Sequence, residues 1–462
     1  MKRILITALV VGVYVLSRAL TPQALAQDVR INVPYERFTL PNGLNVILHE
    51  DHSTPTVAVN TYYLVGSGRE KPGRTGFAHL FEHIMFEGSK NVPEGKFDQW
   101  LEAAGGNNNG STNTDRTNYY ETVPSNAIEL PLFLESDRLG YLLGTMSPEK
   151  VNGQRDVVKN ERRQSYENRP YGMAFIKIVE NMYPKGHPYS WPTIGYMKDL
   201  TAASYKDVVD FFKSWYVPNN TSIVVAGDID MAKTKKLVEK WFSEIPAGKP
   251  IPAIDPPAAQ LAVEKRLVME DNVQLPRLYM CWHAPPVFSG ADAANDVLAN
   301  VLAGGKNSRL YKRLVYELQI AQDVSAFNSS SQLGSMFIVI ATARSGHTLK
   351  EIEGVIQEEL DKICTEAPTP REVQRAVNQY EASFLARVEG VENKADVLNN
   401  YYQLTGNPDY FNEDLARYKA LDPSDITATA QTYLGNNDRL SLSVVPTGKR
   451  SDAAANSVEV KK

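Results

Sequence analysis

The chain has 462 residues, a formal net charge of −5 at pH 7 and 43% hydrophobic residues. It is longer than an average domain of about 100–200 residues, so more than one domain is expected, and its acidic balance gives no sign of a nucleic-acid-binding surface. The two cysteines, Cys281 and Cys364, lie far apart, and their presence does not establish a disulfide. Cys281 lies in an apolar stretch, which is typical of a buried thiol.

The first 26 residues have the pattern of a cleavable secretory signal. Lys2 and Arg3 precede an apolar run over residues 4–16, and Ala24-Leu25-Ala26 is typical of a cleavage site. A retained membrane anchor is the alternative. The run is short for a span of about 20 residues, and no later stretch reaches roughly 18 apolar residues. We therefore expect a periplasmic protein that has no membrane anchor after cleavage.

Strands begin near residue 38. Residues 38–40 and 44–49 flank a Pro41-Asn42-Gly43 turn and predict a hairpin, and residues 57–65 continue the sheet. The connections indicate antiparallel strands with helices covering one face. The predicted fold class is therefore α+β rather than a wound parallel sheet.

A His-x-x-Glu-His motif follows at His79, Glu82 and His83. On a helix, positions i and i+4 share a face, so the two imidazoles could bind one zinc ion. Glu82 could take a proton from the attacking water and pass it to the leaving amine. The order of the motif is that of an inverted zinc-peptidase motif. The alternative is a helix with two ordinary histidines. The metal site is favoured because residues further along the chain fit it too.

A third ligand is needed, and the candidate lies in a helix that begins after Ser147-Pro148, a pair typical of a helix start. In this helix Val157, Val158 and Glu161 fall on one stripe, which predicts that Glu161 faces the packed side. A carboxylate aimed inward needs a partner, and either a metal ion or a neighbouring arginine would serve. Spacing alone leaves both possibilities open.

These features resemble the pitrilysin/insulinase family of inverted zinc metallopeptidases, and in particular the zinc-bearing subunit type related to mitochondrial processing peptidase. The resemblance covers essentially the whole mature chain. It rests on His79 to His83, Asn160-Glu161-Arg162-Arg163, Gly73 to Gly76, Asn109 to Tyr120 and Gly186-His187-Pro188-Tyr189. It implies two homologous domains, each an antiparallel sheet with helices packed on one face. It also implies one Zn2+ per chain, held by His79, His83 and Glu161, with Glu82 as general base.

Four further positions are interpreted through the same resemblance. Asn109 and Gly110 would lie on an edge strand that pairs with the backbone of a peptide substrate, although a stretch so rich in Asn and Gly usually indicates a turn. Gln154 stands where many relatives carry a glutamate, and we expect it to orient a zinc ligand or a water molecule. His187 is interpreted as a loop residue that orders the wall of the substrate chamber, rather than as a fourth ligand.

The chain contains two copies of one plan. A helix pattern, an Asn-Asn pair and a strand occur at 204–226 and again at 425–445, an offset of roughly 220 residues. The predicted organisation is a signal peptide (1–26), an N-terminal zinc-bearing peptidase domain (27–245), a proline-rich linker (246–264), a homologous C-terminal domain without a metal site (265–446) and a disordered tail (447–462).

The second half also departs from self-sufficient relatives, which carry an arginine and, seven residues later, a tyrosine that bind the substrate carbonyl. Counting from Ser308-Arg309-Leu310-Tyr311, these positions are Val315 and Gln322. Neither side chain can do the same task. Arg313 and Tyr316 are out of register and are expected on a helix surface.

The predicted function is therefore a zinc-dependent endopeptidase subunit that hydrolyses peptides or unfolded protein segments. It would be completed by a sister subunit that carries the Arg/Tyr pair, as a heterodimer, although a homodimer is possible. The alternatives are a non-catalytic assembly or scaffold subunit of the same family and a metal-binding protein without hydrolysis. The natural substrate and the cleavage specificity are not encoded in any motif.

Overall fold

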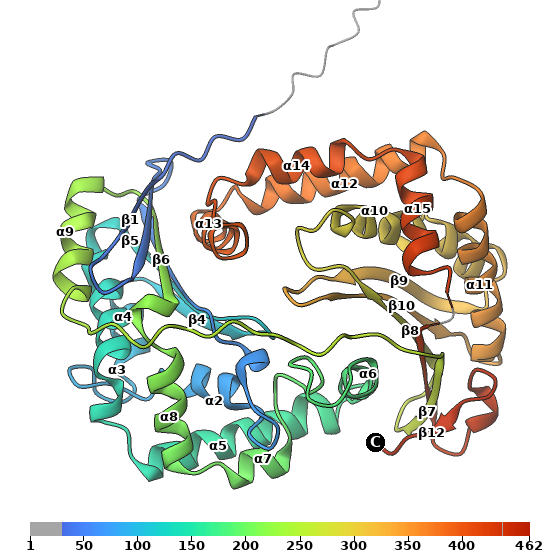
Figure 1. Cartoon of the computed structure of the whole chain (residues 1–462), viewed down its shortest axis with the longest axis horizontal. Coiled ribbons are helices and arrows are strands. Elements are labelled where there is room, and N and C mark those ends of the chain that lie inside the picture. Colours follow the sequence, from blue (N-terminus) through green and yellow to red (C-terminus); the bar gives the residue numbers. More distant parts are fainter. Residues whose placement is uncertain (1–29, 437) are drawn as a thin grey trace, which may run out of the picture. The chain divides into compact units, whose positions relative to one another are not determined.

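The structure is a computed structural model that describes residues 30–436 and 438–462. The predicted signal peptide lies outside the described residues, as does the beginning of the predicted N-terminal domain. Within the described part, two six-stranded sheets provide the framework, one formed by each half of the chain (Figure 1).

The first sheet has the strand order β1-β2-β6-β3-β5-β4, so β4 is an edge strand. Its strands pair antiparallel, except that β2 and β6 are parallel. The hairpin predicted around residues 41–43 joins β1 to β2. The strands are β1 (Glu36–Thr39), β2 (Asn45–Glu50), β3 (Thr56–Tyr63), β4 (Asn107–Thr112), β5 (Thr117–Pro124) and β6 (Thr221–Gly227).

The second sheet repeats this plan in the order β12-β7-β11-β8-β10-β9. Its parallel pairs are β7–β11 and β7–β12. Strands β6 and β11 begin at Thr221 and Leu440, close to the expected offset of roughly 220 residues. The strands are β7 (Lys265–Asp271), β8 (Arg277–Ala284), β9 (Ala321–Ser329), β10 (Ser335–Ala343), β11 (Leu440–Pro446) and β12 (Val458–Glu459). The predicted α+β class is confirmed.

Helices surround both sheets, and polar side chains cap several of their N-termini, including the predicted cap at Ser147. Ser147 accepts a hydrogen bond from the Lys150 N–H, and Ser204 forms a capping box with Asp207. The first half contains α2 (Phe77–Ile84), α3 (Lys96–Ala103), α4 (Glu129–Tyr141), α5 (Pro148–Arg162), α6 (Ala174–Met182), α7 (Met197–Ala202), α8 (Tyr205–Trp215) and α9 (Met231–Phe242). The second half contains α10 (Asp292–Ala303), α11 (Leu349–Thr365), α12 (Pro370–Arg387), α13 (Val391–Thr405), α14 (Phe411–Lys419) and α15 (Pro423–Tyr433).

Helices were expected on one face of each sheet. In the structure, a helix from each half of the chain also packs against the sheet of the other half. Side chains alternate between the two faces of a strand. On β3, Val57 and Val59 point into the hydrophobic core, whereas Asn60 and Tyr62 point to α13. Asn399 of α13 donates a hydrogen bond to Asn60 Oδ1 at 3.0 Å. Helix α13 therefore covers the face of the first sheet opposite the core.

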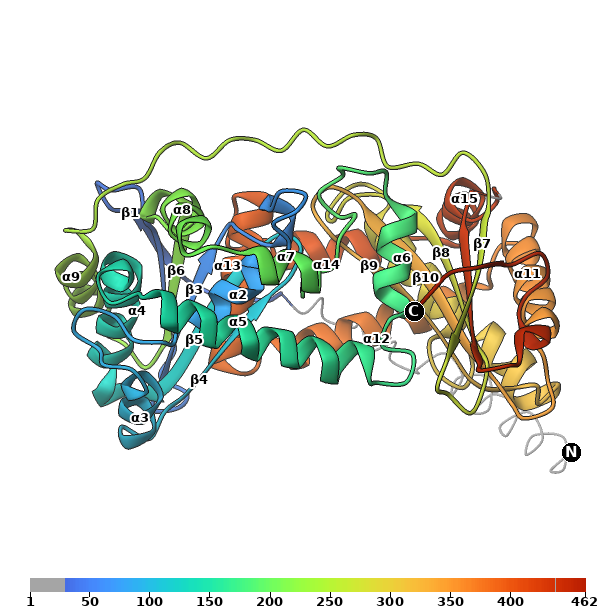
Figure 2. The same cartoon turned by 90° about the horizontal axis from the view of Figure 1, so that it is seen from below.

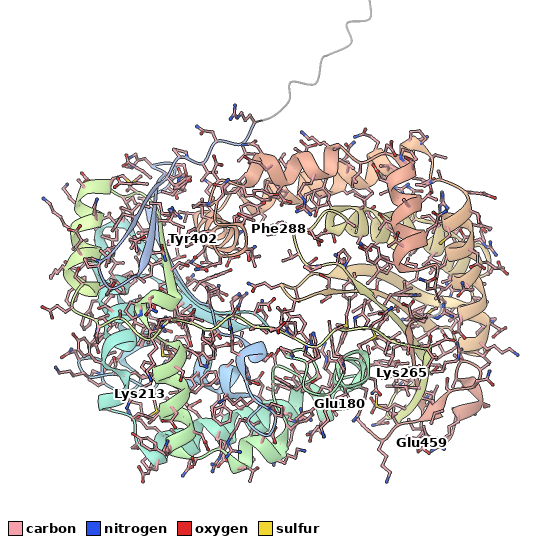
Figure 3. The ribbon with its side chains drawn as sticks, in the orientation of Figure 1. Glu180, Lys213, Lys265, Phe288, Tyr402 and Glu459 are labelled. Atoms are coloured by element: carbon pink, nitrogen blue, oxygen red, sulfur yellow. The ribbon has the colours of Figure 1, made fainter. Side chains whose placement is uncertain are left out.

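Helix α6 makes the reciprocal contact with the second sheet, which Figure 2 shows beside β8. The Phe175 ring meets the Tyr279 ring edge-on, with centroids 5.9 Å apart. Lys265, which is labelled with Glu180 in Figure 3, donates through Nζ to the Asn181 carbonyl at 2.5 Å. This exchange brings α6 between the second sheet and the candidate site on α2.

The segments predicted as linker and tail differ from each other. Residues 246–264 form neither helix nor strand, which fits a proline-rich connection. The prediction of a disordered tail over residues 447–462 is wrong. Val458 and Glu459 form β12 and pair with β7, and Lys462 forms an ion pair with Asp271. Without β12, β7 would be an unpaired edge, and covering an edge stabilises a sheet.

Among the described residues, none of the helices combines the length and the apolar character needed to cross a membrane.

Candidate zinc-peptidase site

The site is built around the short helix α2. Gly76 precedes the helix with φ of 86°, a left-handed conformation that glycine adopts without strain. The buried Glu70 carboxylate accepts hydrogen bonds from the Gly76 and Ala78 N–H groups at 2.9 and 2.8 Å, which satisfies donors at the helix N-terminus. The apolar residues of α2 face the core, and they are Phe77, Leu80, Phe81 and Ile84. The helix is therefore anchored at its start and along one face.

Helix α5 brings Glu161 to the two histidines of α2. Glu161 Oε2 lies 3.5 Å from His79 Nε2 and 3.4 Å from His83 Nε2. Val158 is fully buried, but Val157 is 45% exposed, so the predicted stripe was wrong at Val157. Successive helical residues lie about 100° apart, and the packed face of α5 includes Val158 but not Val157. Glu161 itself lies at the edge of that face, with 38% of its side chain exposed.

The three side chains fit a zinc ion. Among the described residues they are the one group of three or more possible ligands whose ligand atoms all lie within 4.8 Å of one another. Zinc bonds of about 2.0–2.1 Å at tetrahedral angles separate ligand atoms by roughly 3.3 Å, close to the two observed separations. The two imidazole rings meet nearly edge-on, with centroids 4.9 Å apart. Imidazole nitrogen and carboxylate oxygen are ligands that zinc commonly takes in enzymes.

The protonation states also suit a metal. Burial lowers the pKa of His79, against the opposing influence of the nearby Glu161 carboxylate. The hydrogen bond from His83 lowers the pKa of Glu161. At neutral pH this favours a neutral His79 beside an ionised carboxylate, which are the forms that bind a metal. His79 Nδ1 is buried and has no hydrogen-bond partner within the described part of the protein.

Glu82 lies on the same helix and is held by the edge strand β4. The Thr112 hydroxyl donates a hydrogen bond of 2.6 Å to Glu82 Oε2. Gly110, two residues earlier on β4, lies so close that a Cβ there would be 3.3 Å from Glu82 Cγ and 3.1 Å from Tyr119 Cδ1. Strand alternation explains why Gly110 and Thr112 both face the helix. Thr112 was not predicted from the sequence, although its position two residues after Gly110 was a usable signal.

Asn109 and Gly110 lie on an edge strand rather than in a turn. Asn109 is exposed, and its Oδ1 accepts a hydrogen bond of 2.8 Å from the Gly110 N–H. Gln154 Nε2 donates to Glu87 Oε1, so its hydrogen bond among the described residues goes to Glu87 rather than to a candidate ligand. The orienting role of Gln154 toward a zinc ligand or a water molecule stays a prediction.

His187 lies apart from the three candidate ligands. Its ring stacks on Tyr183, with centroids 4.6 Å apart, and its Nδ1 accepts a hydrogen bond of 3.0 Å from the Tyr189 N–H. Tyr183 and Tyr189 both line the cavity beside the candidate site. The loop role predicted for His187 agrees with this packing.

Comparison with known proteins supports the same interpretation. A family model described as "Insulinase (Peptidase family M16)" matches residues 45–191, and a second, described as "Peptidase M16 inactive domain", matches residues 202–380. The chain belongs to the insulinase family of peptidases, family M16.

Several members of the M16 family resemble the chain over most of its length. "Zinc protease PqqE" of Helicobacter pylori is 28% identical over 89% of this chain and 93% of that protein. "Probable mitochondrial-processing peptidase subunit beta" of Arabidopsis thaliana is 23% identical over 88% of this chain and 78% of that protein. The crystal structure of a protease from Helicobacter pylori superposes with a TM-score of 0.85 and 26% identity, covering 90% of this chain and 100% of that one.

In this M16 chain, the positions of the expected Arg/Tyr pair carry no such groups. Val315 is buried and Gln322 is exposed on β9. Arg313 forms ion pairs with Glu358 and Glu359, at 2.8 and 3.0 Å, which hold it on the helical surface as expected. Tyr316 is 76% exposed. Cys281 is a buried free thiol and Cys364 is also free, so the structure contains no disulfide between them.

Proposed function

We propose that this chain is the zinc-bearing subunit of an exported endopeptidase that cleaves extended peptides or unfolded protein segments. The observation that carries the proposal is the convergence of the His79, His83 and Glu161 ligand atoms beside Glu82. The names of the relatives, which include zinc proteases, support the same reaction class. The signal pattern in the first 26 residues supports export to the periplasm.

His79, His83 and Glu161 would hold one zinc ion per chain. When bound, zinc supplies Lewis acidity toward the scissile carbonyl and the attacking water. Glu82 takes the proton from that water and delivers it to the leaving amine. The Thr112 hydroxyl holds Oε2 of Glu82, which leaves Oε1 available for the proton.

The edge strand β4 would hold the substrate. An extended peptide that adds to a sheet edge binds through its backbone and demands little of its own side chains. The Gly110 N–H, which now donates to the Asn109 side chain, is a donor that a substrate carbonyl can take over. The peptide would then run past Glu82, because β4 packs against α2.

A sister subunit would complete the site. With Val315 buried and Arg313 engaged by Glu358 and Glu359, this chain's second half does not offer the arginine and tyrosine that stabilise a developing oxyanion. We propose a heterodimer in which the partner supplies both groups. A homodimer is the alternative arrangement.

Cleavage of an unstructured quenched peptide tests the proposal. The mature chain is assayed alone and mixed with a homologous subunit that carries the Arg/Tyr pair, with Glu82→Gln as the control in both. Glu82-dependent cleavage in the mixture alone supports a shared site, and Glu82-dependent cleavage by the chain alone excludes the need for that partner. Zinc binding with no cleavage in either sample would instead support a non-catalytic subunit.

A further inference from the structure

A cavity of about 580 Å³ lies where α10, α12 and α14 meet in the second half of the chain. Among the described residues, none lines both this cavity and the one beside the candidate zinc site. Its size falls within the range of small-molecule sites, about 300–1,000 Å³. Asp296 of α10 is the one charged side chain among the described residues that line it. The surroundings of Asp296 therefore decide which charge the cavity can accept.

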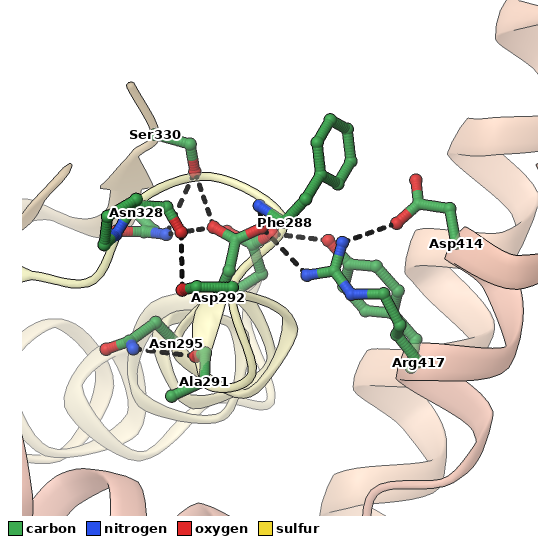
Figure 4. Close-up of polar contacts among 12 residues, drawn as sticks. Phe288, Ala291, Asp292, Asn295, Asn328, Ser330, Asp414 and Arg417 are labelled. Carbon is green, nitrogen blue, oxygen red and sulfur yellow. Dashed lines mark hydrogen bonds and ion pairs between the residues drawn. The ribbon is translucent and has the colours of Figure 1, made fainter. Parts of the chain in front are cut away.

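Asp296 has no counter-charge. Its Oδ2 accepts a hydrogen bond of 2.6 Å from the Tyr418 hydroxyl, and no lysine or arginine of the described chain forms an ion pair with it. Arg417 of α14 is already engaged, because it donates to Asp292 at 2.9 Å and to Asp414 at 3.0 Å, as Figure 4 shows. A carboxylate that leaves water without a counter-charge is costly. A cation in the cavity would remove this cost.

The protonation of Asp296 reflects the same imbalance. Burial raises the pKa of Asp296 to about 7, and Asp292 and Asp414 add to this shift against the influence of Tyr418 and Arg417. Without a counter-charge the carboxyl is therefore divided between its neutral and ionised forms at neutral pH. A cation within about 4–6 Å would favour the ionised form.

The rest of the wall supplies a second acceptor and an aromatic surface. Asn300 lies one helical turn after Asp296, on the same face of α10, and its Oδ1 is buried without a hydrogen-bond donor among the described residues. Tyr380 stacks on Tyr418 and donates its hydroxyl to Asp414 at 3.1 Å. Aromatic rings attract cations through their quadrupole. The apolar lining residues are Val297, Ala376 and Ala382.

We propose that this cavity binds an organic amine, a primary ammonium group carried on an apolar or aromatic body. The ammonium donates to the Asp296 carboxylate and to the Asn300 side-chain oxygen, while the body packs against the two tyrosine rings. An ammonium group offers three N–H donors and no acceptor, which matches two oxygen acceptors that face each other's turn of the helix. A hard metal ion fits less well, because it prefers six to eight oxygen ligands and much of this wall is aromatic or apolar. The site does not depend on the proposed peptidase function, since none of the candidate zinc ligands lines it.

Binding of 2-phenylethylammonium to the mature chain tests this site. 2-Phenylethanol, which has nearly the same shape but no charge, is the control ligand, and isothermal titration calorimetry measures both affinities. We expect the ammonium compound to bind at least about tenfold more tightly than the alcohol, with an affinity that rises from pH 6 to pH 8 as Asp296 ionises. Equal affinities for the two compounds, or no binding of either compound, would overturn the proposal.

Two substitutions locate the binding. Asp296→Asn removes the charge but keeps the shape of the side chain, and it should lower the affinity for the ammonium compound at least about tenfold. Asp361→Asn is the matched control, because Asp361 is exposed on α11 and does not line the cavity, and it should keep the affinity. Unchanged affinity in Asp296→Asn would overturn the proposal.

Gln379 gives a second test that does not alter a buried residue. Gln379 is exposed on α12 and lines the cavity, so Gln379→Lys would place an ammonium group of the chain itself there and exclude the ligand. Gln379→Glu should retain binding. Equal affinity in these two variants would contradict a cation site.

A capped Gly-Gly-Lys-Gly-Gly peptide distinguishes the sources of the amine. Binding of this peptide that is lost in Asp296→Asn would identify the ligand as a lysine side chain of another polypeptide. Binding of 2-phenylethylammonium without binding of the peptide would identify it as a free small amine. Either result supports the site at Asp296.

Discussion

The Thr112 hydroxyl donates a hydrogen bond of 2.6 Å to the Glu82 carboxylate, joining the edge strand β4 to the helix α2. Thr112 sits on the strand that would bind the substrate backbone, and Glu82 is the candidate general base. One bond therefore relates the position of the substrate strand to the orientation of the base. A carboxylate fixed at one oxygen presents the other in a defined direction, which is what proton transfer requires.

Replacing Thr112 with valine should lower kcat by roughly 10- to 100-fold, because a hydrogen bond to a charged group contributes about 1.5–3 kcal/mol. Valine has nearly the same shape as threonine, so the strand should remain intact. Thr112→Ser restores the hydroxyl and should recover most of the rate. Zinc content, kcat and KM are measured for all three proteins. An unchanged kcat in Thr112→Val, or a loss of zinc, would show that Thr112 does not orient Glu82.

Gly110→Ala should reduce cleavage several-fold without unfolding the protein. The new Cβ would lie 3.3 Å from Glu82 Cγ and 3.1 Å from Tyr119 Cδ1, so either the base or the edge strand must shift. Gly153→Ala in α5 is the matched control, because a Cβ there meets nothing within 4 Å. Peptide cleavage and melting temperature are compared for both variants. Equal activity in the two variants would contradict the close packing of β4 on Glu82.

Removing the metal should lower the melting temperature, because zinc would link α2 to α5 in the folded state alone. A ligand at 1,000 times its Kd stabilises the folded state by about 4.1 kcal/mol. The Glu161→Ala variant should have a lower melting temperature, and a chelator should no longer change that temperature. Asp156→Ala, an exposed carboxylate on the same helix, should keep the response. Differential scanning calorimetry with and without chelator checks this, and an equal chelator effect in Glu161→Ala would exclude Glu161 as a ligand.

Local patterns in the sequence predicted much of this site. The i, i+4 spacing of His79 and His83 and the cap at Ser147 depend on neighbouring residues, and the structure agrees with both. The position of Glu161 relative to the histidines came from resemblance to a family, since nothing local relates α5 to α2. The sequence pattern alone does not tell which of the adjacent residues Val157 and Val158 is buried, because this depends on how α5 packs against the rest of the protein.

Features that depend on distant contacts could not be predicted in this way. The hydrogen bond between Asn399 and Asn60 joins residues 339 positions apart. No pattern in the sequence predicts that α13 covers the first sheet. The tail looked disordered because it is small and charged, yet pairing with β7 supplies partners that its own sequence lacks. The cavity beside the site has the same origin, because its lining joins residues of α2 and α6 to Met336 of β10.

His187 should make the protein less stable in mild acid. Burial lowers its pKa from 6.5 to about 4, and its Nδ1 accepts the Tyr189 N–H, a bond that protonation would abolish. Between these two pH values the unfolded chain binds more protons than the folded chain, so the free energy of unfolding falls as pH falls from about 6.5 to 4. In His187→Gln the melting temperature should decline less over this window, because the group that resists protonation is gone.

His52 offers a control of opposite sign, since hydrogen bonds to Asp228 and Glu50 raise its pKa. Its contribution to stability is present in acid and lost as pH rises, so His52→Gln should keep or steepen the decline. The melting temperatures of the unmodified chain and both variants are measured by thermal unfolding at pH 4, 5, 6 and 7. If the melting temperature of His187→Gln fell with pH as much as that of the unmodified chain, this would contradict a buried neutral His187.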